Sequence, residues 1–316
     1  MNFNIPELRA FIEVVRRGSF SGAAVELNLS QPALSRRIDL IESALGARLL
    51  DRHHDGSRLT AAGRSFLPHA EAALAELRDG MESVRSTHRG ESGQLVVALV
   101  ASLCNRAVME ALERFRRESP SIQLTLHTAT SAEVSRLVQS GDASFGVRYR
   151  PDPDRRLECT ALGHETMMVV CSPRNPIATM KSVSVSRLAE ETWIVWPLRP
   201  NEPDGGFPRV LAGYGLKKGR SIMVTDSTIL QKQLIEADFG IGIMSARSVA
   251  ADLAAGTLCA PNVPAMRGAI PVAMIRRRGA HVSATTQRLM DSLTEAYSTL
   301  QGKRPARAKT SRSAAR

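Results

Sequence analysis

The sequence predicts an α+β multidomain protein with an N-terminal winged helix-turn-helix, a long helix and a C-terminal two-lobed α/β domain. Two short helical patterns flank a polar break at residues 28–30, which is typical of a helix-turn-helix. An apolar stripe of helical spacing then runs from residue 60 to about residue 88, and strand and helix patterns alternate over residues 94–301. A length of 316 residues is enough for two or three domains, each with its own core.

Caps and apolar stripes predict three helices before residue 46. Ser21 can cap a short second helix, and Ser30 can cap a third. Pro32 stands in the first turn of this third helix, where no helical N–H donor is required, and Gly46 stands where a left-handed C-terminal cap belongs. The buried stripes are expected to be Leu8, Phe11, Ile12 and Val15 in the first helix, over residues 5–17, and Leu34, Ile38, Ile41 and Leu45 in the third.

The residues off the third helix's apolar stripe suggest its partner. Gln31, Ser35, Arg36 and Arg37 face away from the core in its first two turns. A helix that enters the major groove of DNA needs amide, hydroxyl and guanidinium groups there, because these pair with base edges and phosphates. One basic pair alone would be an ordinary solvated face. Together with the small preceding helix and the polar turn, it indicates a DNA-binding helix-turn-helix.

The run SFSGAAVELNLSQPALSRRIDLIESALG, followed by RLLDR and RLTAAG, resembles the N-terminal domain of LysR-type transcriptional regulators from residue 5 to about residue 67. The resemblance implies a hairpin wing after the third helix that reaches a minor groove. Asp55 stands at a wing position that is often arginine in the family, and an acid there should repel phosphate. The resemblance also implies a set of DNA-contacting residues: Ser30, Gln31, Pro32, Ser35, Arg36, Arg37, Arg52 and Arg58.

The stripe over residues 60–88 resembles the seam of two paired helices. Its apolar residues recur at spacings of three and four. A two-fold dimer would place two recognition helices on repeated half-sites of DNA. The alternative is a single helix that packs on its own domain. The stripe consists of Leu67, Ala70, Leu74, Leu77, Met81 and Val84.

Beyond a hinge at residues 89–93, the strand–helix rhythm predicts a mostly parallel sheet with right-handed crossovers. Two lobes joined by two crossings resemble the effector-binding half of the same regulators and periplasmic binding proteins. We expect a winged helix-turn-helix at residues 1–59, a linker and dimerisation helix at 60–88, lobe 1 from 94–165 and 269–301, lobe 2 from 166–268, and a disordered basic tail at 302–316.

Polar residues at strand ends predict a ligand site between the lobes. Strand ends and helix N-termini favour anions, so we expect a small anionic molecule there, such as a carboxylate. Serines before helices are also ordinary caps, which leaves the structural alternative open for Ser102, Ser131 and Ser227. The candidate effector-binding residues are Ser102, Thr130, Ser131 and Arg148 in lobe 1, and Arg199, Asn201 and Ser227 in lobe 2.

Bulk charge does not locate the DNA-binding part. The net charge is +11, yet residues 1–90 hold 12 Lys/Arg against 11 Asp/Glu, whereas the tail holds six basic residues and no acid.

Four scattered cysteines without a CxxC pair fit a reducing compartment and predict no metal site. Since no signal peptide or membrane-length apolar run is present, we expect a cytoplasmic protein.

Nucleotide-binding and hydrolase motifs do not match, so the sequence predicts a protein that is not an enzyme and that needs no cofactor. Two alternatives stay open, namely hidden chemistry in the two-lobed half and an architectural DNA-binding protein that needs no ligand. The resemblance implies a regulator that binds an inverted-repeat promoter as a homodimer or homotetramer, contacts RNA polymerase and senses a small-molecule effector.

Overall fold

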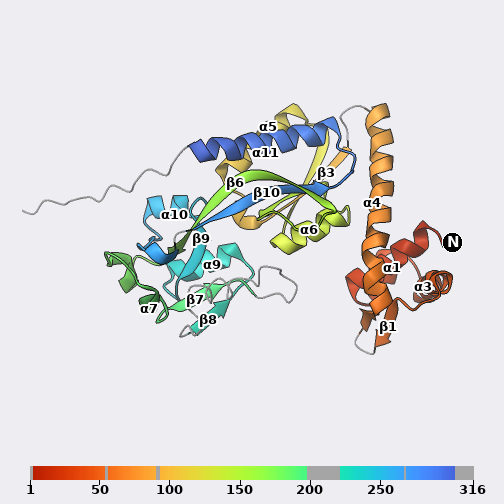
Figure 1. The fold of residues 1–316 in the computed structure, drawn as a ribbon, viewed down its shortest axis with the longest axis horizontal. Coiled ribbons are helices and arrows are strands. Elements are labelled where there is room, and N and C mark those ends of the chain that lie inside the picture. Colours follow the sequence, from red (N-terminus) through yellow and green to blue (C-terminus); the bar gives the residue numbers. More distant parts are fainter. Residues whose placement is uncertain (1–2, 54–55, 90–92, 198–220, 267, 303–316) are drawn as a thin grey trace, which may run out of the picture.

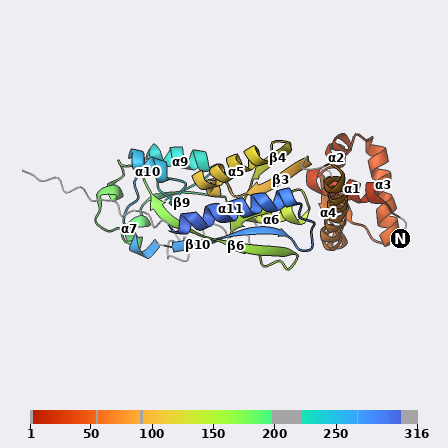
Figure 2. The ribbon, with the colours of Figure 1, turned by 90° about the horizontal axis from the view of Figure 1, so that it is seen from above.

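The structure, a computed structural model, describes residues 3–53, 56–89, 93–197, 221–266 and 268–302. A small helical domain and one long helix stand at one end of the molecule, and a two-lobed α/β domain extends away from them (Figure 1). Figure 2 shows the same arrangement from above, with α4 between the N-terminal helices and the α/β domain.

The N-terminal domain is a helix-turn-helix followed by a hairpin, as predicted. Its helices are α1 (Ile5–Arg17), α2 (Phe20–Glu26) and α3 (Gln31–Leu45), and its strands are β1 (Leu50–His53) and β2 (Gly56–Leu59). Gly46 caps α3 with a φ of 66°. The cap of α2 differs from the prediction: Ser19 Oγ, not Ser21, accepts the hydrogen bond from the N–H of Gly22 at 3.1 Å. Since α2 starts at Phe20, Ser21 already lies inside its first turn.

The long helix α4 (Ala61–Arg89) uses its apolar stripe in two ways. Ala70 and Leu74 are buried in the core of the N-terminal domain, and Leu67 packs against that core. The C-terminal part of the stripe is open, because Leu77 and Val84 are 45% and 63% exposed. The alternative in which the helix packs on its own domain therefore holds for the first half of the stripe alone.

One six-stranded sheet runs through both lobes in the order β4-β3-β5-β10-β6-β9. The prediction of a mostly parallel sheet is wrong, because only β4, β3 and β5 pair in parallel. β6 and β10 run in opposite directions between the lobes, so they must pair antiparallel with each other, and they do so along most of their length. The strands are β3 (Gly93–Leu99), β4 (Ile122–Thr128), β5 (Phe145–Tyr149), β6 (Leu157–Val170), β9 (Gly242–Ser245) and β10 (Gly268–Arg277).

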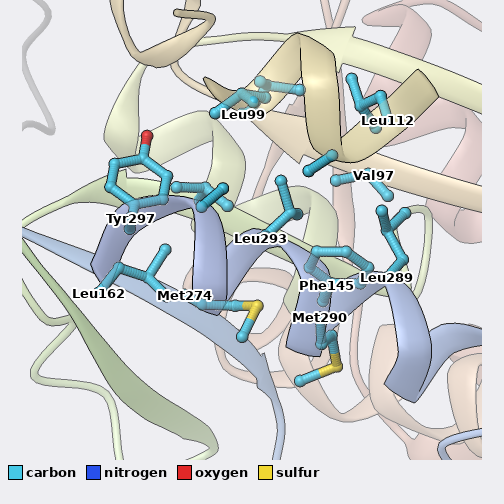
Figure 3. Close-up of a cluster of buried hydrophobic side chains, with 14 of the residues drawn as sticks. Val97, Leu99, Leu112, Phe145, Leu162, Met274, Leu289, Met290, Leu293 and Tyr297 are labelled. Atoms are coloured by element: carbon cyan, nitrogen blue, oxygen red, sulfur yellow. The ribbon is translucent and has the colours of Figure 1, made fainter. Parts of the chain in front are cut away.

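Lobe 1 is closed by α5 (Arg106–Glu118), α6 (Ser131–Gln139) and α11 (Ala284–Gly302). The return of α11 to lobe 1 was predicted, and its side chains supply part of the core. Figure 3 shows Leu289, Leu293 and Tyr297 of α11 facing side chains of the sheet and of α5. Tyr297 is 1% exposed, and its hydroxyl donates to the carbonyl of Leu103 at 3.2 Å.

Lobe 2 holds a second, two-stranded parallel sheet and short helices. The helix after β9 begins at Ala250, because residues 246–249 form a turn. Residues 198–220 of lobe 2, and residues 303–316 of the predicted tail, lie outside the described residues. The elements are α7 (Val185–Leu188), β7 (Thr192–Val195), β8 (Ser221–Val224), α9 (Thr228–Glu236) and α10 (Ala250–Ala255), with 3-10 turns at Pro176–Thr179 and Pro264–Met266. A third 3-10 turn, Ala101–Leu103, follows β3 in lobe 1.

Candidate functional site

The N-terminal turns of α3 form an exposed polar surface. Leu34 and Ile38 are buried on the inner side of the helix, whereas Gln31, Pro32 and Arg36 are exposed on the outer side. Ser35 and Arg37 are partly exposed beside them. Ser30, which was predicted to contact DNA, caps α3 by accepting from the N–H of Ala33 at 3.3 Å. The outer side of α3 therefore presents the amide of Gln31, the hydroxyl of Ser35 and the guanidinium of Arg36, which are groups that can pair with base edges.

The two predicted wing arginines differ in their surroundings. The Arg52 guanidinium lies 4.4 Å above the ring of Phe20, and it also pairs with Asp39 of α3 at 3.2 Å. These contacts tie the wing to α2 and α3, so Arg52 holds the wing in position in addition to any phosphate contact. Arg58 is exposed on β2, opposite Asp51 in the hairpin. Asp55 lies outside the described residues.

A cleft of about 220 Å³ lies between the two lobes. Its polar lining in lobe 1 consists of Ser102, Thr130, Ser131 and Tyr149, the first three of which were predicted. Lobe 2 adds hydroxyl and amide groups opposite them, and apolar side chains from both lobes complete the walls. The lobe 2 residues are Met167, Trp196, Pro197, Thr228, Gln231, Ile243, Met244, Ser245 and Ser248.

Arg148, a predicted effector-binding residue, does not line this cleft, so the structure gives its predicted contact no support. Its side chain is 4% exposed, pairs with Asp152 and donates to Ser135 Oγ at 3.1 Å. Successive residues of a strand point to opposite faces, so on β5 only one of Arg148 and Tyr149 can face the cleft. The one that faces it is Tyr149, whose hydroxyl lies 2.9 Å from Ser102 Oγ.

We expect Arg148→Met to lower the free energy of unfolding of the protein, beyond any effect on a ligand response. Removing one partner of a buried ion pair leaves Asp152 uncompensated, at a cost of about 3 kcal/mol or more. Urea unfolding of the full-length protein measures this loss. Arg114→Met is the control, because Arg114 pairs with Glu295 on the surface, where such a pair contributes about 1 kcal/mol or less. Equal stabilities of the two variants would contradict the structural role.

The predicted lobe 2 residues are only partly placed. Ser227 does not line the cleft, because its hydroxyl caps α9 by accepting from the N–H of Leu230 at 3.2 Å. The next residue, Thr228, lines the cleft, and its Oγ1 is buried with no hydrogen-bond partner among the described residues. Arg199 and Asn201 lie outside the described residues.

A buried carboxylate stands behind the cleft. Glu165 of β6 is fully buried, and it accepts from Ser245 Oγ at 2.6 Å and from Arg247 Nη1 at 2.7 Å. Burial raises the pKa of the nearby Tyr149 phenol, so this group stays a neutral hydroxyl. The cleft therefore presents hydroxyl groups of Ser102, Tyr149 and Ser245 that are held by hydrogen bonds, whereas Thr228 Oγ1 has no partner among the described residues.

Sequence reasoning missed several lining residues, including Tyr149, Thr228 and Ser245. The first two follow directly after a predicted residue, at Arg148 and Ser227. Strand alternation would have offered Tyr149 as the alternative to Arg148. No local signal in the sequence points to Ser245, since its position depends on the pairing of β9 with β6.

The cysteines do not form a reactive pair. Burial raises the pKa of the Cys171 thiol to about 12, and burial also raises the pKa of Cys104. At pH 8 the Cys171 side chain is therefore the unreactive thiol and not the thiolate. We expect a thiol reagent to label the exposed Cys159 first and to leave Cys171 unmodified until the protein unfolds, as peptide mass spectrometry would show. Rapid labelling of Cys171 in the native protein would contradict this.

Across the described ranges, no group of three or more His, Cys, Asp or Glu side chains could hold a metal ion. The helices within those ranges are too short or too polar to cross a membrane.

The chain matches two family models, one for each half. Residues 5–64 match the bacterial regulatory helix-turn-helix protein of the lysR family, and residues 88–298 match the LysR substrate binding domain. The chain belongs to the LysR family of transcriptional regulators. It is thus a DNA-binding regulator with an effector-binding domain, and it is not an enzyme.

Individual relatives agree with this assignment. The regulator is 30% identical over 248 residues to the uncharacterized HTH-type transcriptional regulator YnfL of Escherichia coli K12, covering 78% of this chain and 80% of that protein. It is 26% identical over 287 residues to the RuBisCO operon transcriptional regulator of Allochromatium vinosum, covering 90% and 93%. Both of these relatives are named as regulators of transcription.

Solved structures share the fold at low sequence identity. Full-length OxyR from Pseudomonas aeruginosa superposes with a TM-score of 0.64 at 15% identity, covering 94% of this chain and 95% of that one. ArgP from Mycobacterium tuberculosis superposes with a TM-score of 0.64 at 19% identity, covering 94% and 98%. The whole architecture, from winged helix to second lobe, is therefore that of full-length LysR regulators.

Proposed function

We propose that this regulator binds an inverted-repeat promoter through α3 and that a small anionic effector in the cleft modulates that binding or the activation of transcription. Gln31, Ser35 and Arg36 are the proposed base-reading residues, since they are exposed or, for Ser35, partly exposed in the first turns of α3. Arg37, Arg52 and Arg58 would contact phosphates. A contact with RNA polymerase is also proposed, without a surface assigned to it.

The observation that carries the effector proposal is the convergence of two helix N-termini on one cleft. The helix α6 begins at Ser131 in lobe 1, and α9 begins at Thr228 in lobe 2. Both residues line the cleft. The first N–H groups of a helix have no partner within the helix, and the helix dipole favours a negative charge there. Opposed helix starts can therefore clamp an anion between the lobes without an arginine.

The other residues that line the cleft indicate the chemical character of the uncharged part of the effector. Met167, Trp196 and Met244 present apolar surface to the cleft. Glu165 stands behind Ser245, so a second negative charge at that end would meet a buried carboxylate. A carboxylate with an apolar body fits this arrangement better than a compact polyacid, because its apolar part leaves water for an apolar wall.

A thermal-shift panel on the full-length protein tests this proposal. Hexanoate, benzoate and the matched dicarboxylate adipate are compared with hexanamide and benzamide, which lack the charge. We expect a monocarboxylate to raise Tm by several degrees, since a ligand at a hundred times its Kd adds about 2.7 kcal/mol of stability. The amides should not raise Tm.

The variant Ser102→Ala/Thr228→Val should lose this shift, because it removes one hydroxyl from each side of the cleft. Thr179→Val is the control, since Thr179 is exposed in a distant 3-10 turn. An unchanged shift in the double variant, or a shift with the amides alone, would contradict the proposed effector site.

A further inference from the structure

The turn that joins α6 to β5 contacts the DNA-binding half of the same chain. Asp142 accepts from Arg16 of α1 at 2.5 Å through one oxygen and from Arg78 of α4 at 3.2 Å through the other. Arg78 also donates to the carbonyl of Ser140 at 3.3 Å. One carboxylate of lobe 1 thus holds an arginine of the DNA-binding domain and an arginine of the linker helix together.

The packing beside this carboxylate is close. Gly141 has a φ of 71°, and a Cβ at this position would lie 2.7 Å from the Cβ of Ala75, so a larger residue would push α4 away. Ala75 is fully buried on the face of α4 that meets lobe 1. The turn at residues 140–142 is therefore shaped to let α4 approach.

A second ion-pair cluster supports the same junction. Arg277, at the end of β10, donates to Asp79 at 2.6 Å and to Glu76 at 3.4 Å. Its side chain is 11% exposed, which is low for an arginine at a domain boundary. Lobe 1 thus contributes an acid, Asp142, to one ion pair with α4 and a base, Arg277, to another. Because the two pairs have opposite polarity, they fix how the two surfaces align.

The helix α6 connects this junction to the cleft. Its N-terminus, at Thr130 and Ser131, lines the cleft, and its C-terminal cap, Ser140, belongs to the junction turn. Nine residues of helix span about 14 Å. Figure 1 shows α6 ending beside α4. Val134 presses on β5, because a Cβ on Gly146 would meet its Cγ1 at 2.4 Å, so α6 and β5 are expected to move as one unit.

We propose that the turn at residues 140–142 docks the DNA-binding half onto lobe 1, and that α6 transmits the state of the cleft to this docking surface. The idea rests on the proposed effector site. A ligand that draws the start of α6 toward lobe 2 shifts the Asp142 carboxylate against Arg16 and Arg78. The orientation of α1 and α4, and with it the placement of α3 on DNA, changes accordingly.

Hydrogen exchange of the full-length protein tests the docking surface. In Asp142→Asn, amides at 71–79 of α4 and 135–142 are expected to exchange at least threefold faster than in the wild type. Ala75→Leu, which wedges the junction without removing a charge, should do the same. Glu295→Gln is the matched control, because it removes a carboxylate that pairs with Arg114 at 2.8 Å on a remote surface. Unchanged exchange at 71–79 in both junction variants would overturn the docking surface.

A pair of cleft-filling variants tests the transmission. Ser131→Phe fills the cleft from the start of α6, whereas Ser248→Phe fills it from lobe 2. We expect at least a twofold change in exchange at 71–79 with Ser131→Phe and none with Ser248→Phe. If neither variant, or both equally, alters that segment, α6 does not carry the signal and the proposal falls. The outcome does not depend on whether a carboxylate binds, so it is distinguishable from failure of the thermal-shift panel.

Discussion

Replacing Ser35 and Arg36 together by alanine is expected to weaken binding to the intergenic DNA upstream of the regulator's own gene by at least a hundredfold. Each well-formed contact between a side chain and a base edge contributes about 1–3 kcal/mol of discrimination, so two lost contacts amount to about 3 kcal/mol. Fluorescence anisotropy over a salt series measures the effect. If Arg36 contacts a phosphate, the slope of log affinity against log salt also decreases by about one.

The control for this experiment is Arg117→Ala. Arg117 is an exposed arginine of α5, so its replacement removes the same charge at a distance from α3. Binding of this variant should match the wild type, and the wild type should prefer its own DNA over a scrambled duplex. Equal losses in both variants would mean that bulk charge binds DNA, and the assignment of α3 as the reader would be wrong.

We propose that the exposed half of the α4 stripe pairs two copies of this chain, and introducing charge there is expected to dissociate this dimer. In Leu77→Arg/Met81→Arg, two apolar side chains per chain become cations at the proposed seam. Burying such a side chain contributes about 1.5–3 kcal/mol, and a two-fold interface buries each one twice. Self-association should weaken at least a thousandfold, as sedimentation velocity would show. Because two-fold DNA sites require two recognition helices, DNA affinity should fall as well.

A glycine inside α4 also supports the proposed pairing of two α4 helices. Gly80 lies in α4 between Leu77 and Val84, and among the described residues beyond its own turn of helix no atom lies within 4 Å of where a Cβ would stand. Glycine inside a helix costs about 1 kcal/mol relative to alanine, so its position next to the exposed stripe favours close approach of a second helix. Met180→Arg, which charges an exposed methionine of lobe 2, is the control. A double variant that remains dimeric would refute the seam.

The helix-turn-helix of the N-terminal domain could be predicted from the sequence, apart from the residue that caps α2. Caps, apolar spacing and the terminal glycine of α3 are local signals, and they determine a helix before any tertiary contact is made. The polar face of α3 follows from the same spacing, since Leu34 and Ile38 define the buried side. The element order of the two lobes was likewise readable, because strand and helix patterns differ in period.

Only the tertiary structure decided which side chains face the cleft or the solvent and which strands pair with each other. The sequence placed Arg148 at a strand end, but only the packing of α6 against β5 turned it toward Asp152 and left Tyr149 in the cleft. The stripe of α4 is continuous in sequence, yet the N-terminal domain covers Ala70 and leaves Val84 exposed. Strand order, burial and the docking of Asp142 on two arginines depend on contacts between residues far apart in the chain, which no local pattern encodes.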